Sequence, residues 1–150
     1  MDHWLPRATA MHPDRVALRT PRATLTYAEL LARASAAAGG LREQGVGAGD
    51  RVALALDSPD QLVVAVQGCF LLGAVAVPVD RRLGAGERAQ RAAGARVLVQ
   101  EPPSGQPIVP EPLRLEAIAT VIHTSGTTAT PRPVALSYSN WLSSALGSAV

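Results

Sequence analysis

Two hydrophobic patterns alternate along the chain. Some apolar residues form short unbroken runs, and others recur every three or four positions between polar residues. A short unbroken run is typical of a strand buried on both faces, whereas the wider spacing is typical of one face of a helix. The runs predict buried strands at residues 52–56, 74–79, 96–100 and 118–122. The spaced residues predict helices at residues 4–11, 27–44, 60–72, 86–93 and 141–150.

The order of these elements indicates the fold class. Between residues 52 and 100 the chain alternates strand, helix, strand, helix and strand, which is typical of parallel βαβ units. We therefore expect an α/β fold with a mostly parallel, doubly wound sheet and helices on both faces. Residues 16–19 and 24–26 are predicted as two short strands around a turn. Five prolines predict a stiff surface loop at residues 101–113.

Several residues mark where the helices begin and end. Thr26 can cap the helix that follows it, with Glu29 three residues later as its capping-box partner. Gly45 and Gly47 end that helix. Ser58 or Asp57 is the expected cap of the next helix, with a proline in its first turn.

The apolar stretch at residues 62–79 is close to the length that spans a bilayer. Gln67, Gly68, Gly73 and Pro78 interrupt it. A helix, a turn at Gly73 and a strand explain the stretch better, so we expect no membrane span.

Composition narrows the functional classes. A chain of 150 residues with 47% hydrophobic content can bury one core, so we expect one domain or part of one. The 14 basic residues are all arginines and are scattered, which leaves a net charge of +2 without the basic block or aromatic platform of a nucleic-acid site. Cys69 is the single cysteine and has no neighbouring histidine, so we expect a packed core residue. A lone thiol cannot form an internal disulfide, which fits a reducing compartment. The N-terminus has no apolar core of the signal-peptide type, so secretion is not indicated.

The most polar part of the sequence follows the last predicted strand. Hydroxyls, a glycine and one cation gather there, and such groups can bind a phosphate through side-chain hydroxyls, backbone N–H groups and a guanidinium. The alternative is an ordinary Ser/Thr-rich turn. The candidate binding residues are Thr124, Ser125, Gly126, Thr127, Thr128 and Arg132.

The three histidines are weaker candidates. His123 precedes the hydroxyl-rich segment and is expected to be a strand-end residue rather than an acid or base. His3 and His12 have no ligand partners nearby in sequence, so a metal site is not expected from them.

Residues 124–134 resemble the phosphate-binding signature of the adenylate-forming, or AMP-binding, enzymes, which include the acyl-CoA and aryl-CoA synthetases. That signature reads Thr-Ser-Gly-Thr-Thr-Gly-x-Pro-Lys-Gly-Val. Residues 25–30, Leu-Thr-Tyr-Ala-Glu-Leu, resemble a first family motif. Residues 71–80 resemble a second, which ends in Val-Pro-Leu-Asp in the family, with Gly73 and Ala74 in swapped order here. The three motifs stand in family order, and the first two are expected to be structural.

Three positions depart from the signature. Ala129 replaces a glycine and is strained if the backbone there needs positive φ. Pro133 replaces the last glycine and removes an N–H that could have bonded an oxygen. Arg132 replaces a lysine and keeps the charge on a bulkier, bidentate group.

The resemblance implies a carboxylate-CoA ligase. In that family a small carboxylate attacks the α-phosphate of Mg-ATP to give an acyl-adenylate and pyrophosphate, and coenzyme A then displaces AMP. ATP, Mg²⁺ and coenzyme A are thus the implied substrates and cofactors, and a homo-oligomer is left open. The four hydroxyl residues at 124, 125, 127 and 128 would donate hydrogen bonds, Gly126 would allow close approach, and Arg132 would offset charge on the pyrophosphate.

Two short segments narrow the resemblance. Residues 3–5, His-Trp-Leu, and residues 140–149 look most like the o-succinylbenzoate-CoA ligases of menaquinone biosynthesis, which act in the cytoplasm. Residues 1–150 would then be a partial N-terminal AMP-binding domain without the C-terminal lid domain, and inactive alone. The alternatives are a non-catalytic nucleotide-binding or regulatory module with a degenerate phosphate loop, and an unrelated α/β domain.

Overall fold

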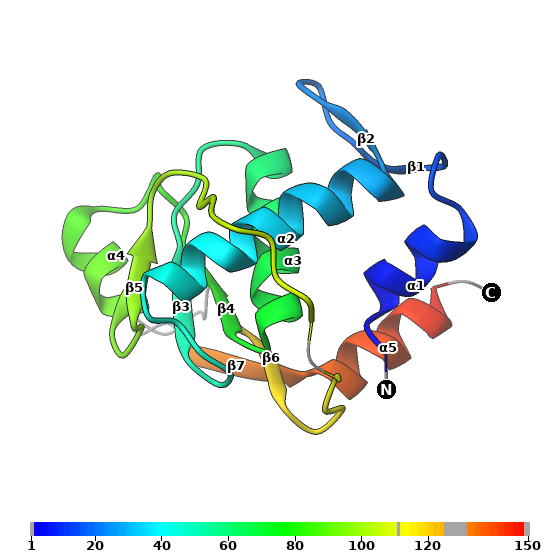
Figure 1. Cartoon of the computed structure of the whole chain (residues 1–150). Coiled ribbons are helices and arrows are strands. Elements are labelled where there is room, and N and C mark those ends of the chain that lie inside the picture. The colour runs from blue at the N-terminus through cyan, green and yellow to red at the C-terminus, as the bar shows by residue number, and fades with distance from the viewer. Residues whose placement is uncertain (1, 111, 125–131, 149–150) are drawn as a thin grey trace.

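The computed structural model describes all residues except 1, 111, 125–131 and 149–150. Its helices are α1 (Trp4–Met11), α2 (Tyr27–Glu43), α3 (Pro59–Leu72), α4 (Ala85–Ala92) and α5 (Tyr138–Gly147). Its strands are β1 (Val16–Arg19), β2 (Thr24–Thr26), β3 (Arg51–Leu54), β4 (Val75–Pro78), β5 (Val97–Val99), β6 (Ile118–Thr124) and β7 (Arg132–Ser137). The strands β1 and β2 form a separate antiparallel hairpin beside the start of α2 (Figure 1).

The main sheet has the strand order β5-β3-β4-β6-β7 (Figure 1). Strand β3 pairs in parallel with β4 and with β5, and β4 pairs in parallel with β6 through Ala76 and Thr120. Only the β6–β7 pair is antiparallel among the described strands of this sheet. The predicted α/β fold with a mostly parallel sheet is therefore confirmed, with strand limits that differ by one or two residues at most ends.

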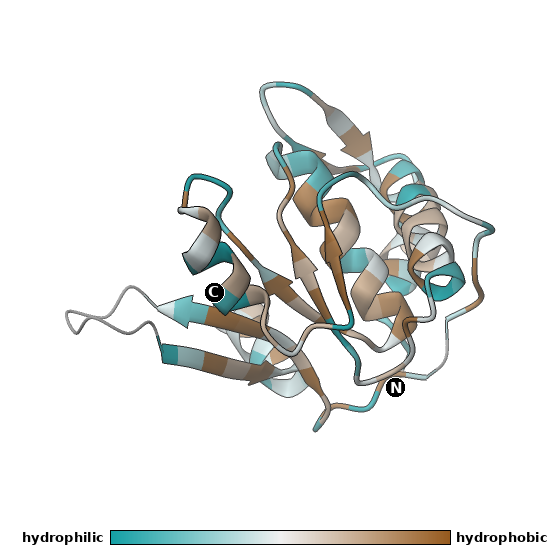
Figure 2. Cartoon of the chain, turned by 90° about the vertical axis from the view of Figure 1, so that its left-hand side faces the viewer, coloured by the Kyte–Doolittle hydropathy of each residue, from teal (hydrophilic) through white to brown (hydrophobic). Residues whose placement is uncertain are grey.

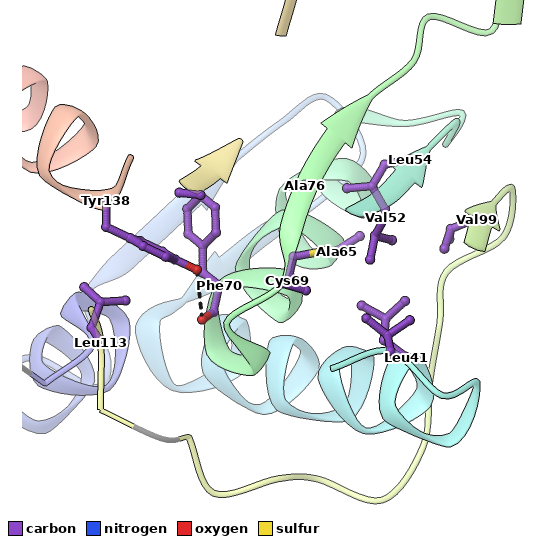
Figure 3. Close-up of a cluster of buried hydrophobic side chains, with 13 residues drawn as sticks. Leu41, Val52, Leu54, Ala65, Cys69, Phe70, Ala76, Val99, Leu113 and Tyr138 are labelled. Atoms are coloured by element: carbon purple, nitrogen blue, oxygen red, sulfur yellow. Dashed lines mark hydrogen bonds between the residues drawn. The ribbon is translucent and has the colours of Figure 1, made fainter. Parts of the chain in front are cut away.

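Helices cover both faces of the sheet, as predicted. On one face, Val52 and Leu54 pack with Leu41 of α2 and Cys69 of α3 in the largest hydrophobic cluster (Figure 3). On the other face, a smaller cluster of alanines and one valine joins β3 to the end of α4: Ala53, Ala55, Val79, Ala92 and Ala95. Figure 2 shows hydrophobic residues along the strands and on the neighbouring helices. Alternate residues of β3 thus contact opposite layers, which is why Val52, Ala53 and Leu54 are all apolar.

Cys69 is the packed core residue that its apolar surroundings predict. Its side chain is fully buried, and burial raises the pKa of the thiol to about 12. The thiol is therefore uncharged at neutral pH and is not a nucleophile.

Small residues bring α2 and α3 close together. A Cβ atom on Gly68 would lie 3.0 Å from the Cβ of Ala37 and 3.1 Å from the carbonyl oxygen of Ala34. The contact therefore depends on glycine and alanine at these positions. Gly73 ends α3 in the left-handed conformation with φ of 71° and separates it from β4, as predicted. No helix among the described residues is long and apolar enough to cross a membrane.

The helix caps are partly as predicted. The Thr26 capping box is confirmed, with the Glu29 N–H donating to Thr26 Oγ1 at 3.2 Å and the Thr26 N–H donating to Glu29 Oε2 at 2.8 Å. Ser58 occupies the cap position before α3 with proline next to it, but its side chain makes no capping hydrogen bond. The predicted start of the last helix at residue 141 was wrong. Ser137 caps α5 in a second capping box, so the helix begins at Tyr138.

The proline-rich segment 101–113 contains no helix or strand in its described residues, as predicted, but it is not only a surface loop. Its backbone crosses α2 where Gly39 and Gly40 leave room for it. The Gly105 N–H donates to the Ala36 carbonyl at 2.9 Å, and the Gln106 N–H donates to Glu43 Oε1 at 3.0 Å. Ile108 and Leu113 are buried. The glycine pair, which is unfavourable for a helix by itself, is explained by this crossing.

Candidate functional site

The candidate phosphate loop joins two adjacent antiparallel strands. Thr124 is the last residue of β6 and Arg132 is the first residue of β7, and their Cα atoms are paired in the ladder. The Thr124 Oγ1 hydroxyl donates to the Arg132 carbonyl oxygen at 3.4 Å. The other predicted site residues, Ser125, Gly126, Thr127 and Thr128, lie outside the described residues. The structure therefore places the two ends of the loop together and leaves the middle as a prediction.

The direction of β6 sets where the loop emerges. Since β6 runs parallel to β4, Thr124 lies at the same edge of the sheet as the carboxyl ends of β3 and β4. Ligands of open α/β sheets bind beyond this edge. Thr124 and Arg132 are both exposed there. The predicted place at the carboxyl edge of the sheet is confirmed for Thr124 and Arg132, the two ends of the loop.

Strand β7 was not predicted from the sequence, which assigned Arg132 and Pro133 to the loop. The structure places Pro133 inside β7, opposite His123. Because β7 is the edge strand of the sheet, it can contain a proline without breaking a central ladder. The expected loss of a phosphate-binding N–H at Pro133 therefore concerns a strand residue rather than a loop residue. The apolar run at residues 134–136 was the signal for this strand.

Two ion pairs organise the loops beside this edge. Arg81 Nη1 lies 2.6 Å from Asp57 Oδ2, which ties the segment after β4 to the segment after β3. The Arg82 guanidinium donates to both Asp80 oxygens, with the shortest contact 2.7 Å. These hydrogen bonds lower the pKa of Asp80 to about 2. Asp80 is therefore a structural residue just beyond the end of β4, as predicted for the second motif.

Arg132 stands apart from these pairs. Within the described part of the chain, the carboxylates of Asp57 and Asp80 pair with other arginines, and no ion pair involves Arg132. An exposed guanidinium without a carboxylate partner is available to an anion. Sequence reasoning singled out Arg132 but missed the two arginines that neutralise the neighbouring carboxylates.

His123 lines a cavity of about 220 Å³ between α4 and the β6–β7 pair. Burial is the main cause that lowers its pKa, with further contributions from Arg91 and Arg51. It is the second-last residue of β6, which agrees with the predicted strand-end position. A larger cavity of about 600 Å³ is lined by the first residues of three parallel strands, Arg51, Val75 and Ile118. These first residues lie at the edge of the sheet opposite Thr124.

An aromatic cluster holds α5, the helix that follows β7, against α3. Phe70 of α3 lies 5.7 Å from Trp4, 5.3 Å from Tyr138 and 6.0 Å from Trp141 between ring centres. The Tyr138 hydroxyl donates to the Phe70 carbonyl at 3.4 Å (Figure 3). The Trp141 indole N–H donates to Thr120 Oγ1 at 3.0 Å. Both segments that resemble the o-succinylbenzoate-CoA ligases thus contribute tryptophans to one structural cluster.

The described residues do not form a metal centre by themselves. No three of their His, Cys, Asp or Glu side chains gather closely enough to hold a metal ion. His3, at the start of the aromatic cluster, is buried rather than open to a ligand.

The sequence is similar to known proteins along its whole length. The family model for "AMP-binding enzyme" matches residues 5–107. The 2-succinylbenzoate–CoA ligase of Bacillus licheniformis is 32% identical over an alignment that covers 100% of this chain and 37% of the ligase. The corresponding ligase of Bacillus subtilis is 30% identical, with 99% of this chain and 35% of the ligase covered. The chain therefore spans about a third of the length of these relatives.

Solved structures give the same comparison for the fold. The o-succinylbenzoate CoA synthetase of Bacillus subtilis in complex with its acyl-adenylate intermediate superposes with a TM-score of 0.89 at 31% identity. That match covers 99% of this chain and 46% of the synthetase chain. The same synthetase in complex with ATP and magnesium ion superposes with a TM-score of 0.84 at 29% identity, covering 99% of this chain and 47% of the other.

Proposed function

This chain belongs to the family of AMP-binding enzymes, and from that premise we propose that it is the opening part of the N-terminal domain of an ATP-dependent carboxylate-CoA ligase. The proposed acid substrate is 2-succinylbenzoate, and the proposed pathway is menaquinone biosynthesis in the cytoplasm. Relatives of that activity that match nearly the whole chain at about 30% identity support this choice.

One observation carries the proposal. The segment with the Thr-Ser-Gly-Thr-Thr motif begins at the carboxyl end of β6 and ends at Arg132. Both ends lie at the edge of the sheet where ligands of α/β proteins usually bind. At this position the hydroxyls of Thr124, Ser125, Thr127 and Thr128 would donate to phosphate oxygens. Gly126 would allow the backbone to approach, and Arg132 would offset the charge of the departing pyrophosphate.

The proposed reaction has two steps. The carboxylate oxygen of the acid forms a bond to the α-phosphorus of ATP, and the bond from that phosphorus to the bridging oxygen of pyrophosphate breaks. The thiol sulfur of coenzyme A then attacks the acyl carbon, AMP leaves with the former carboxylate oxygen, and the thiol proton passes to solvent. This chain's residues would position the triphosphate and stabilise charge on it. Mg²⁺ would neutralise phosphate charge when bound, and this portion of the protein offers it no carboxylate cluster among the described residues.

The resemblance places the contacts to adenine and ribose, the Mg-binding glutamate and the catalytic lysine in later segments of family members. We therefore propose that residues 1–150 alone do not form acyl-CoA, whereas a protein of full family length does. Measurable 2-succinylbenzoyl-CoA formation by residues 1–150 alone would contradict this part of the proposal.

The loop is tested by nucleotide titration. Calorimetry of a family-length protein with Mg-ATP should show binding. The Ser125→Ala/Thr128→Ala double variant should weaken it about a hundredfold or more, because each lost donor to a charged phosphate removes about 1.5–3 kcal/mol. The control is Ser143→Ala, which removes an exposed hydroxyl on α5 away from the loop. Unchanged ATP affinity in the double variant would show that the loop has only a structural role.

A second candidate function, a non-catalytic nucleotide-binding module, is favoured by Ala129, which departs from the family glycine. Pyrophosphate release distinguishes the two candidates. A ligase releases pyrophosphate from ATP only when 2-succinylbenzoate is added, whereas the module binds ATP without releasing it. The Ala129→Gly variant should bind ATP more tightly than the unmodified protein if the alanine has weakened the loop.

A further inference from the structure

The cavity of about 220 Å³ on the α4 side of the sheet has polar walls and an apolar floor. Val77 and Val121 form the floor, and both side chains are buried in the sheet. Three groups that can carry positive charge line the walls, each from a different element: Arg51 of β3, Arg91 of α4 and His123 of β6. None of the lining residues is a carboxylate. The cavity therefore combines cationic donors with a small volume that is partly open to solvent.

Two nitrogens of these walls are buried without a hydrogen-bond partner among the described residues. They are Nε of Arg91 and Nδ1 of His123. The Arg91 side chain is only 14% exposed, and its one ion pair joins Nη2 to Glu87 Oε1 at 2.7 Å, which leaves Nε unused. Arg91 Nε is always a donor, and a buried donor without an acceptor is unfavourable by about 1–3 kcal/mol. His123 Nδ1 is a second donor in the imidazolium or in the tautomer that carries its proton there, so an acceptor in the cavity could satisfy both nitrogens.

The surrounding charges favour an anion as that acceptor. Burial lowers the pKa of His123 most, and the positive charges of Arg91 and Arg51 lower it further. The nearby carboxylates are already engaged, Glu87 with Arg91 and Asp80 with Arg82. Glu87 offsets the charge of Arg91, whereas Arg51 forms no ion pair within the described part of the chain, so a net positive potential remains at the cavity.

We propose that this cavity is a binding site for a small oxyanion, a carboxylate or phosphate group, which accepts hydrogen bonds from Arg91 Nε and from a protonated His123 Nδ1. Arg51 supplies a third positive charge at the wall. The volume is below the roughly 300 Å³ at which drug-sized ligand pockets begin, so it suits a single oxyanion and excludes a nucleotide. The residues that would bind the oxyanion are not the candidate phosphate-binding residues, and the proposal does not rest on the ligase function.

The unmodified chain provides a direct test by NMR. Inorganic phosphate and acetate are titrated in turn at constant ionic strength, with chloride as the control ion, and the His123 ring signals and the Ala93 and Ala95 amides are followed. We expect saturable shifts with at least one oxyanion and none with chloride. We also expect the pKa of His123 to rise on binding, because an anion that binds the imidazolium better than the imidazole must favour protonation by the same factor. A response to phosphate alone or to acetate alone supports the proposal and identifies the group.

Variants separate the site from a general charge effect. Arg91→Gln should weaken oxyanion binding about tenfold, because it replaces a charge-assisted hydrogen bond, whereas Arg91→Lys should retain part of the attraction. Arg88→Gln is the matched control, since Arg88 lies on the same helix but donates to the carbonyls of Arg81 and Leu83 and does not line the cavity. The amide spectrum of each variant reports whether the fold is retained.

Two results would overturn the proposal. The first is the absence of saturable shifts at His123 with either oxyanion in the unmodified chain, a measurement that needs no variant. The second is equal oxyanion affinity in folded Arg91→Gln and in the unmodified chain. Neither result bears on ATP binding by the Ser125 and Thr128 loop, so the two proposals fail independently.

Discussion

Replacing Gly39 by alanine tests whether the close contact between α2 and the proline-rich segment needs a glycine at this position. A Cβ atom at this position would overlap the backbone carbonyl of Gln106, which cannot rotate away as a side chain can. The neighbouring Gly40 is also confined, since its Cβ would lie 2.6 Å from the Ser104 nitrogen. The segment must therefore move away from α2 in the Gly39→Ala variant.

The expected magnitude follows from what the movement breaks. The Gly105 hydrogen bond to Ala36 and the Gln106 hydrogen bond to Glu43 would be lost, at about 1 kcal/mol each. Partial exposure of Ile108, which is 8% exposed in the intact structure, removes about 1 kcal/mol more. Alanine favours the helix over glycine by about 1 kcal/mol. The net loss in free energy of unfolding is therefore about 2 kcal/mol.

Urea denaturation followed by circular dichroism measures this loss. With a denaturant slope of about 2 kcal/mol per molar urea, the midpoint should fall by about 1 M. Gly86→Ala is the matched control, because Gly86 also lies in a helix but a Cβ there meets nothing within 4 Å. That variant should be unchanged or more stable by up to about 1 kcal/mol. If Gly39→Ala behaved like Gly86→Ala, the steric reasoning would be refuted.

Three further predictions concern other contacts. Thr26→Ala removes one half of a capping box and should lower the free energy of unfolding by about 1 kcal/mol in urea denaturation; an unchanged midpoint would contradict the cap. The Asp80 pKa of about 2 lies below its ordinary value of 3.8, so its pairing stabilises the fold fully above pH 3.8 and is lost as the pH falls through about 2. Arg82→Gln should remove that part of the acid unfolding profile, and superimposable profiles would argue against it. Trp141→Phe deletes the donor to the buried Thr120 hydroxyl and should cost about 1–2 kcal/mol in thermal unfolding, whereas an unchanged melting temperature would show that the hydrogen bond is dispensable.

The candidate site was predictable from the sequence only in part. The motif and its place after a buried strand were evident, and the structure confirms the position of Thr124 at the carboxyl end of β6. The pairing of Arg132 with Thr124 was not evident, because antiparallel pairing depends on two segments separated by the loop itself. The roles of Ser125, Gly126, Thr127 and Thr128 stay predictions.

The cationic cavity was beyond any sequence argument. Its walls come from residues 51, 91 and 123, which share no motif and no spacing. His123 was correctly placed near the end of a strand, but its partners were not foreseen because they lie on α4 and β3. Only the stacking of α4 over the sheet brings these side chains to one cavity.

By itself the sequence determined the features that depend on neighbours within one or two turns of chain. These are the alternation of strands and helices, the capping box at Thr26 and the break at Gly73, and each arises from local backbone preferences and hydrophobic periodicity. The tertiary structure alone decided the crossing of residues 104–106 over Gly39 and Gly40, the edge position of β7 and the aromatic contacts of Trp4 with Phe70. Those features join residues far apart in sequence, so they are selected by close packing and by the need to pair buried backbone groups, neither of which leaves a local pattern in the chain.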